Sequence, residues 1–430
     1  LAAGNLLKPS DGRPVAVPSQ DMILGSYYLT LDKPGEPGEG KIFRDENEAL
    51  MAYDSKYITL HSKIKVRRTA EVNGKTMTGL VETTVGRIIF NRPIPQDLGF
   101  TDRTNPENAL NYEIDFLVGK SQLGKIIDKC IRKHGTQITS EVLDAIKSQG
   151  YKYSTIGAIT VAVCDAAIPP AKKEIIAQAE IDKDSITDLY NEGLISNDER
   201  YKKVLEIWNA ATNDVTDALK NNMDAYNPIW MMADSGARGS IDQIKQLAGM
   251  RGLMVNPQGK KIEVPVKSCF RNGLSVLEYF ISSHGGRKGL TDTALKTADS
   301  GYLTRRLVDV SHEIIVREED CCAGRKPQGM VVKAIYDTVG KEIEGLKSRI
   351  LGRFAAEDVI HPTTGEVLVG MNQFIDEKEA AAICDAGLTE VSIRSVFACS
   401  SRFGVCAKCY GKNMATTLPV QVGEAVGTIA

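Results

Sequence analysis

Five of the nine cysteines are spaced in a way that could bind a metal ion. Cys406 and Cys409 form a Cys-x-x-Cys pair, Cys399 lies seven residues before it, and Cys321 and Cys322 lie further upstream. Two thiolates separated by two residues can bind one tetrahedral zinc ion at a Zn–S distance of ~2.3 Å, and Cys321 or Cys322 could supply the fourth ligand. A redox Cys-x-x-Cys is the alternative, but that motif normally opens a helix within a βαβ pattern, and here further cysteines accompany it. The spacing therefore predicts a closed structural zinc site with no catalytic role.

A second group of residues that could do chemistry lies between His284 and Arg306. Basic side chains at helical spacing can bind successive phosphates, and the small residues Thr297 and Ala298 between them would let a base pair lie against a helix. From charge alone, a solvated helix face is an equally good interpretation. This segment contains five basic residues, Arg287, Lys288, Lys296, Arg305 and Arg306, and two acidic ones, Asp292 and Asp299.

The element that must position this basic cluster is a long helix. No proline occurs from Gly273 to Val316, and the apolar residues recur at three-to-four spacing. A helix of ~36 residues would be ~54 Å long. Gly285, Gly286, Gly289 and Gly301 interrupt it, at a cost of roughly 1 kcal/mol each against alanine. The glycines favour a helix that bends or lets another group approach closely, and an imperfect core helix is the alternative.

Residues 171–220 predict an antiparallel helical hairpin, because two apolar-periodic runs flank a polar break at 191–198. The hairpin is acidic, with 7 Lys or Arg against 11 Asp or Glu. A solvated face and a docking surface for partners are both open interpretations.

Elsewhere, residues 1–115 predict strands and turns with little helix, including an Asn73-Gly74 hairpin turn and a strand at 81–90. Residues 116–149 and 239–248 predict helices, and residues 321–430 predict short strands and turns around the cysteines.

The composition of the 430 residues is that of a folded globular protein, with 42% apolar and 25% charged residues. This excludes bulk disorder, and no apolar run approaches the ~20 residues of a membrane span. The net charge of −2 gives no global evidence for nucleic-acid binding. No secretory signal is visible, and both ends of the chain look like cuts within a longer protein.

Several long runs carry a specific resemblance. Residues 277–290 read LEYFISSHGGRKGL, and residues 297–309 read TADSGYLTRRLVD. Together they closely resemble the bridge helix of the bacterial RNA polymerase β′ subunit. Further runs resemble the same subunit across essentially the whole chain, in order: VPSQDMILG at 17–25, MMADSGARGS at 231–240, QLAGMRGLM at 246–254 and FGVCAKCYG at 403–411.

The resemblance implies a role for each matching residue. Arg238 would lie near the incoming triphosphate, and Thr297 and Ala298 against the base pair at the insertion site. Arg287 and Arg305 would contact the template strand, with Lys288 beside them on the nucleic-acid side of the bridge helix. The hairpin at 171–220 would form the rim of the secondary channel, where transcript-cleavage and stringent-response factors dock, and residues 250–270 would contact the bridge helix. The zinc ligands implied are Cys321, Cys399, Cys406 and Cys409, with Cys322 an open alternative to Cys321.

The implied fold is α+β and multidomain: mixed small β/α modules, the long antiparallel helical hairpin, the glycine-containing bridge helix and a zinc module with four cysteine ligands. Residues 1–168 would form a pore-like region and 169–248 a funnel region. Residues 249–316 would hold a loop and the bridge helix, at about 274–312. Residues 317–430 would hold the zinc-binding module and the start of the following cleft region.

The implied function is a part in DNA-templated RNA synthesis by the catalytic β′ subunit of a nucleotidyltransferase. Its partners would be the β, α, ω and σ subunits, DNA and RNA, in the nucleoid-associated cytoplasm of a bacterium, with no membrane. The aspartates that bind catalytic Mg²⁺ would lie before Leu1 and the trigger loop after Ala430, so this chain alone should be inactive. One alternative is a non-catalytic scaffold on which factors dock. Another is a free-standing zinc-dependent nucleic-acid binder, whose DNA affinity would fall steeply with salt.

Overall fold

A computed structural model of the chain describes residues 4–72, 75–103, 105, 108–338 and 340–429. These residues divide into two compact units. The sheet unit is Ala16–Ala294, and the cysteine unit combines Leu1–Val15 with Leu295–Ala430.

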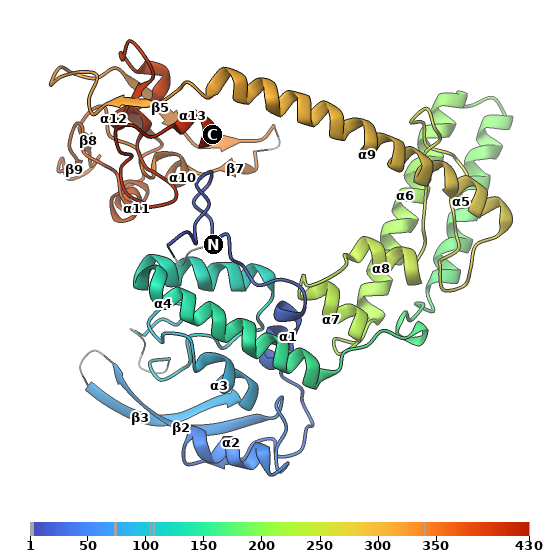
Figure 1. Cartoon of the computed structure of the whole chain (residues 1–430). Helices are drawn as coiled ribbons and strands as arrows, with labels where there is room; N and C mark the ends of the chain where they lie inside the picture. The colour runs from blue at the N-terminus through green and yellow to red at the C-terminus, as the bar shows by residue number, and fades with distance from the viewer. Residues whose placement is uncertain (1–3, 73–74, 104, 106–107, 339, 430) are drawn as a thin grey trace. The chain divides into compact units, whose positions relative to one another are not determined.

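The sheet unit contains a three-stranded sheet of order β1-β2-β3. β1 (Ile42–Phe43) pairs parallel with β2 (Lys63–Val72), and β2 pairs antiparallel with β3 (Lys75–Thr84) along their whole length. Figure 1 shows β2 and β3 as a long curved ribbon. The predicted hairpin is therefore confirmed in its strands, while its turn residues Asn73 and Gly74 lie outside the described residues.

Three helices occupy the region that the sequence predicted to contain little helix: α1 (Asp21–Thr30), α2 (Glu46–Asp54) and α3 (Val85–Asn91). That prediction was wrong. α1 is buried on nearly all sides, so its apolar residues are not confined to one face. It therefore lacks the one-sided pattern by which a surface helix is recognised in a sequence. The predicted strand at 81–90 is wrong in its second half. There the Thr84 hydroxyl accepts a hydrogen bond from the Arg87 amide and starts a helix, although β-branched residues follow.

α4 (Lys120–Gly157) is the longest helix of the sheet unit, and its axis breaks at Gly135, where φ is 76°. It packs on α1 at a point where neither helix has a side chain. A Cβ added to Gly25 would lie 1.9 Å from the carbonyl oxygen of Gly150, so only glycine allows this approach. The main core of the unit surrounds this crossing, with Ile23, Leu29, Ile126 and Ile146 among its fully buried side chains.

The predicted helical hairpin is confirmed as α5 (Lys172–Asn191) and α6 (Asn197–Asn222), which lie side by side in Figure 1. α6 begins with a capping box, in which the side chains of Ser196 and Glu199 hydrogen-bond to each other's backbone amides. A small core around Trp208 joins the two helices. The 3₁₀ turn η1 (Val163–Asp165) precedes the hairpin, and α7 (Pro228–Asp234) and α8 (Ile241–Ala248) follow it.

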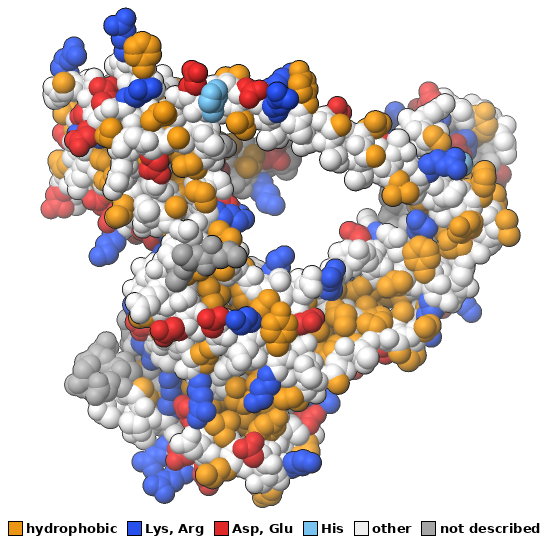
Figure 2. Space-filling view, in the orientation of Figure 1, with side chains coloured by type: hydrophobic (Ala, Val, Ile, Leu, Met, Phe, Trp, Pro, Cys, Tyr) orange, Lys and Arg blue, Asp and Glu red, His pale blue; other side chains and the backbone are white. Residues whose placement is uncertain are grey.

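The predicted long helix is α9 (Val276–Ser311), a single helix of 36 residues. All of its residues are described, and of these only Ser282 is buried. Leu290, Leu295, Tyr302 and Leu307 are each more than 60% exposed. Figure 2 shows hydrophobic side chains interspersed with charged ones along it. The core-helix interpretation of its glycines is therefore wrong for the described chain.

The cysteine unit is built from short paired elements. β10 (Glu390–Arg394) pairs antiparallel with β5 (Gly329–Lys333), and β11 (Val405–Cys406) pairs parallel with β4 (Val316–Glu318). Two small antiparallel pairs add β6 (Ile335–Tyr336) with β7 (Glu342–Glu344), and β8 (Val359–Ile360) with β9 (Val367–Val369). The helical elements are α10 (Leu346–Ile350), α11 (Glu377–Asp385), η2 (Val396–Ala398), α12 (Ala407–Tyr410) and α13 (Val426–Ile429).

This mixture of helices with small separate sheets confirms the predicted α+β, multidomain fold class. Among the described residues, no helix is both long enough and apolar enough to cross a membrane.

Candidate metal centre

Four short elements of the cysteine unit bring the predicted ligands together. Cys406 ends β11 and caps α12, accepting a hydrogen bond from the Cys409 amide at 3.3 Å. Cys399 directly follows η2. Pairing of β11 with β4 places the loop that carries Cys321 beside them. The turn before β11 depends on Gly404, whose φ is 68°; a Cβ there would lie 2.2 Å from the Ile315 carbonyl oxygen.

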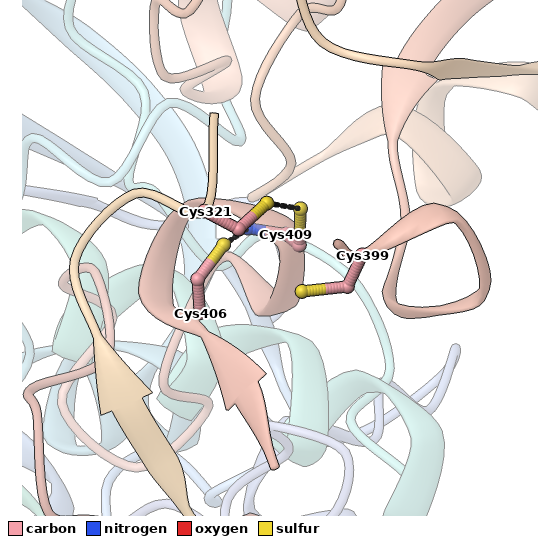
Figure 3. Close-up of side chains that lie close together, drawn as sticks. All are labelled: Cys321, Cys399, Cys406 and Cys409. Atoms are coloured by element: carbon pink, nitrogen blue, oxygen red, sulfur yellow. Dashed lines mark hydrogen bonds between the residues drawn. The ribbon is translucent and has the colours of Figure 1, made fainter. Parts of the chain in front are cut away.

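The four sulfurs have the spacing that a tetrahedral metal needs. The Sγ atoms of Cys321, Cys399, Cys406 and Cys409 all lie within 4.8 Å of one another, and Figure 3 shows the side chains converging. The Sγ atoms of Cys321 and Cys409 are 3.7 Å apart. Bonds of ~2.3 Å at tetrahedral angles would place sulfurs ~3.8 Å apart. The residues present therefore fit a structural zinc ion.

Cys321 and Cys322 have different surroundings. Cys321 belongs to the four-cysteine group, whereas Cys322 groups only with Asp320 and Cys321. The two neighbouring sulfurs are 3.7 Å apart. The geometry therefore favours Cys321 as the fourth ligand and leaves Cys322 at the edge of the cluster.

The Cys-x-x-Cys pair does open a short helix after a strand, as a redox motif would. However, two further sulfurs converge on it, which a two-cysteine redox motif does not require. A hydrogen bond with Cys409 lowers the pKa of Cys406 to about 4, and the same bond together with burial raises the pKa of Cys409. The cluster thus already favours a thiolate at Cys406, which is the form that binds metal.

Three charged side chains surround the sulfurs, and sequence reasoning missed all of them. Arg394, at the end of β10, is fully buried, and its Nη2 lies 2.9 Å from Asp320 Oδ1 and 3.4 Å from Cys409 Sγ. Lys408 Nζ lies 2.9 Å from Asp320 Oδ2. Burial alone would raise the pKa of Asp320, but hydrogen bonds from Arg394, the Cys322 amide and Lys408 hold it well below its ordinary value. The sequence signal that could have revealed Arg394 was an arginine directly after Ile393 in a short strand, five residues before Cys399.

The residues predicted to contact nucleic acid are on α9 and in the loop that follows α7. Arg287, Thr297, Ala298 and Arg305 are exposed on α9, and Lys288 is half-buried. Arg305 Nε pairs with Asp309 at 3.7 Å, an ion pair in which both side chains are exposed. Arg238 is exposed in the loop between α7 and α8, where its amide donates to the Met232 carbonyl. The structure therefore places these side chains at the surface, where a partner could reach them.

The predicted contact of residues 250–270 with the long helix is confirmed within the sheet unit. Glu278 Oε1 accepts hydrogen bonds from the amides of Lys267 and Ser268, which fixes the loop to the first turn of α9. A Cβ on Gly285 would lie 3.1 Å from Met254 Cε. The glycine thus lets the loop approach α9 closely.

Comparison with known proteins extends these observations. Residues 5–166, 195–273 and 273–430 match the families described as RNA polymerase Rpb1 domain 3, domain 4 and domain 5. The whole chain is 58% identical to the DNA-directed RNA polymerase subunit beta′ of Clostridium botulinum (strain Loch Maree / Type A3), of which it covers 36%. It is 58% identical to the same subunit of Caldicellulosiruptor saccharolyticus and 59% identical to that of Clostridium acetobutylicum. The chain thus spans just over a third of the length of these relatives.

Proposed function

Because the chain belongs to the family of the RNA polymerase β′ subunit, we propose that it forms part of the enzyme that synthesises RNA on a DNA template. The enzyme would be a nucleotidyltransferase acting as a complex with β, α, ω and σ subunits, in the nucleoid-associated cytoplasm of a bacterium. The observation that carries the proposal is the identity over the whole chain, together with a 36-residue helix that exposes nearly all of its side chains. A helix in that state needs a partner to cover its apolar residues.

The proposed roles follow the sequence matches. Arg238 would lie near the incoming triphosphate, and Thr297 and Ala298 would support the base pair at the insertion site. Arg287, Lys288 and Arg305 would contact nucleic-acid phosphates. Mg²⁺ would be bound outside this chain. The chain would divide into four regions, at 1–168, 169–248, 249–316 and 317–430.

The cysteine cluster would hold one structural zinc ion. Zinc bound by four thiolates has no free position, so it would stabilise the fold and take no part in catalysis. Cys321, Cys399, Cys406 and Cys409 would be its ligands, in accord with the spacing of their sulfurs.

The test uses the complete polymerase with Arg305→Ala or Thr297→Val on α9. We expect a slower elongation rate for both variants on a defined DNA template. Arg317→Ala, an exposed arginine of β4, is the matched control and should leave the rate unchanged. Equal rates for all three variants would contradict the assigned roles on α9.

The second candidate function, a scaffold for factor docking, draws on the acidic hairpin α5–α6. A shallow surface hollow on α5 is lined by Asp184, Asp188 and Glu192, together with Ile181 and Leu189. Asp184→Asn/Asp188→Asn in the complete polymerase should weaken the response to secondary-channel factors and leave factor-free elongation unchanged. If the α9 variants were silent and only the hairpin variants had an effect, the scaffold function would replace the first proposal for this chain.

A further inference from the structure

The buried arginine beside the cysteine cluster directs one guanidinium nitrogen at both a carboxylate and the sulfurs. Arg394 Nη2 lies 3.4 Å from Cys409 Sγ and 3.6 Å from the Sγ atoms of Cys321 and Cys406. Its Nη1 donates to Asn372 Oδ1 at 2.6 Å, and its backbone amide donates to the Phe354 carbonyl at 2.8 Å. One guanidinium nitrogen is therefore aimed at three of the four predicted zinc ligands.

This arrangement fits charged sulfurs and not neutral thiols. A neutral thiol is a weak acceptor, and a fully buried guanidinium group needs negative partners to offset the loss of water. Arg394 is fully buried, and Asp320 is its only carboxylate partner among the described residues. Thiolate sulfurs would supply the remaining negative charge.

The charge balance of a zinc centre points the same way. Four thiolates with one Zn²⁺ carry a net charge of about −2, which is costly to bury. Arg394 and Lys408 add two positive charges, and Asp320, which pairs with both, returns one negative charge. The surrounding residues thus halve the charge of the buried centre, and Asp320 fixes the direction of the guanidinium group.

We propose that Arg394 is a positioning residue of the metal centre. One N–H of its Nη2 donates to Asp320, which orients the guanidinium group, and the other N–H points at the sulfurs, with Cys409 Sγ nearest. This N–H and the positive charge of the guanidinium group would stabilise the zinc-bound thiolates of Cys321, Cys406 and Cys409. This inference rests on the proposed zinc site. Groups that hydrogen-bond to metal ligands typically change metal affinity by about 10- to 100-fold. Arg394 should therefore slow zinc release without being a ligand.

The chain provides a matched control in Arg353. It lies in the same unit, and its Nη1 donates to the carbonyl of Tyr410, the residue after Cys409, at 2.6 Å. Burial lowers the pKa of Arg353, so this arginine, like Arg394, is shielded from water. No hydrogen bond from Arg353 to a sulfur occurs among the described residues. Arg353→Met therefore removes a partly buried arginine near the cluster and leaves the N–H···S bonds in place.

The experiment measures zinc content and the rate of zinc transfer from the full chain to a chromogenic chelator. Wild type should retain one zinc ion. Arg394→Met should release it about 10- to 100-fold faster. Arg394→Lys, which keeps the charge but loses the planar fork, should give an intermediate rate, and Arg353→Met should release zinc at the wild-type rate. With Co²⁺ in place of zinc, Arg394→Met should shift the sulfur-to-metal charge-transfer band to lower energy, because unbonded thiolates donate electrons more readily.

Each contrary result has a distinct meaning. A wild-type chain that binds no zinc would refute the proposed zinc site and this inference with it. Zinc bound by wild type but released equally fast by Arg394→Met would refute the role of Arg394 alone, as would an Arg353→Met variant that releases zinc as fast as Arg394→Met. If Arg394→Met does not fold, Asp320→Asn replaces it. This variant keeps the arginine but removes its orienting charge, and a wild-type release rate for it would also overturn the inference.

Discussion

The crossing of α1 and α4 gives the sharpest test of the packing. In Gly25→Ala, the new methyl group would lie 1.9 Å from the Gly150 carbonyl oxygen and 2.7 Å from its carbonyl carbon. Both are backbone atoms of a helix, so neither can rotate away. To reach the 3.0 Å that real Cβ atoms respect, the two helices must separate by about 1.1 Å at this point.

The expected loss of stability is the sum of an overpacking cost and of the contacts that are lost when the helices separate. Overpacking typically costs ~1–3 kcal/mol. A gap of ~0.5–1 Å also loses a quarter to a half of each dispersion contact across it. Ile23 and Leu29 on α1 are fully buried, and each contributes ~1.5–3 kcal/mol by burial, so losing a third of that adds ~1–2 kcal/mol in total. Gly25→Ala should therefore lower the free energy of unfolding of the sheet unit by ~2–5 kcal/mol.

The assay is urea denaturation of the full chain, followed by the fluorescence of Trp208 and Trp230, which both lie in the sheet unit. Gly124→Ala is the matched control, because it lies on the same α4 and a Cβ there meets no described atom within 4 Å. That substitution should raise the stability by ~0.5–1 kcal/mol, since alanine loses less backbone entropy in a helix. If Gly25→Ala and Gly124→Ala shift the midpoint alike, the close crossing does not control stability and the reasoning fails.

Three further predictions concern other parts of the chain. Burial lowers the pKa of His61 below its ordinary value of 6.5, so the unfolded state binds more protons; stability should be unaffected above about pH 6.5 and should fall, by at most ~1.4 kcal/mol per pH unit, below it. His61→Gln should flatten that slope in denaturation curves between pH 5 and 7, and an unchanged slope would rule out His61 as its cause. A strong zinc chelator should destabilise the cysteine unit, as read by faster hydrogen exchange in the peptides of β10 and α12, while the tryptophan-detected midpoint of the sheet unit stays constant; equal loss in both units would contradict a local role for the metal. Ser196→Ala removes one half of the capping box of α6 and should cost ~1 kcal/mol, whereas Ser185→Ala, within α5 of the same hairpin, should cost less; hydrogen exchange at the start of α6 measures the difference.

The sequence was a good guide for elements that expose at least one face to solvent. The hairpin predicted at 171–220 is α5 and α6, because its apolar residues recur on one side only. The helix predicted at about 274–312 is α9, within two residues at each end. The cysteines converge as their spacing indicates, because Cys-x-x-Cys is a local geometry that needs little help from the rest of the fold.

The predictions failed where contacts distant in sequence, and not the local pattern, determine the structure. α1 is surrounded by other elements, so it has no polar face to reveal its period. α3 carries residues that prefer strands, yet the cap at Thr84 and burial of Ile88 and Phe90 favour a helix. Arg394 was missed because its partners Asp320, Cys321 and Asn372 are distant in sequence, and no local pattern joins them.

The parallel pairing of β4 with β11 has a consequence for how this region can change in length. Cys321 follows the first strand and Cys406 ends the second, so the residues between them leave and return at one place. Those residues have their own core, which includes Ile350, Ile375 and Ile383. Lengthening a loop costs only ~0.6 kcal/mol for each doubling, so segments inserted between β5 and β10 should be tolerated as long as both ends still reach the four sulfurs. A metal ion bound there would limit changes in sequence length as well as stabilise the fold. Insertions between β5 and β10 would cost little, whereas a shift of one residue in β4 or β11 would remove a ligand.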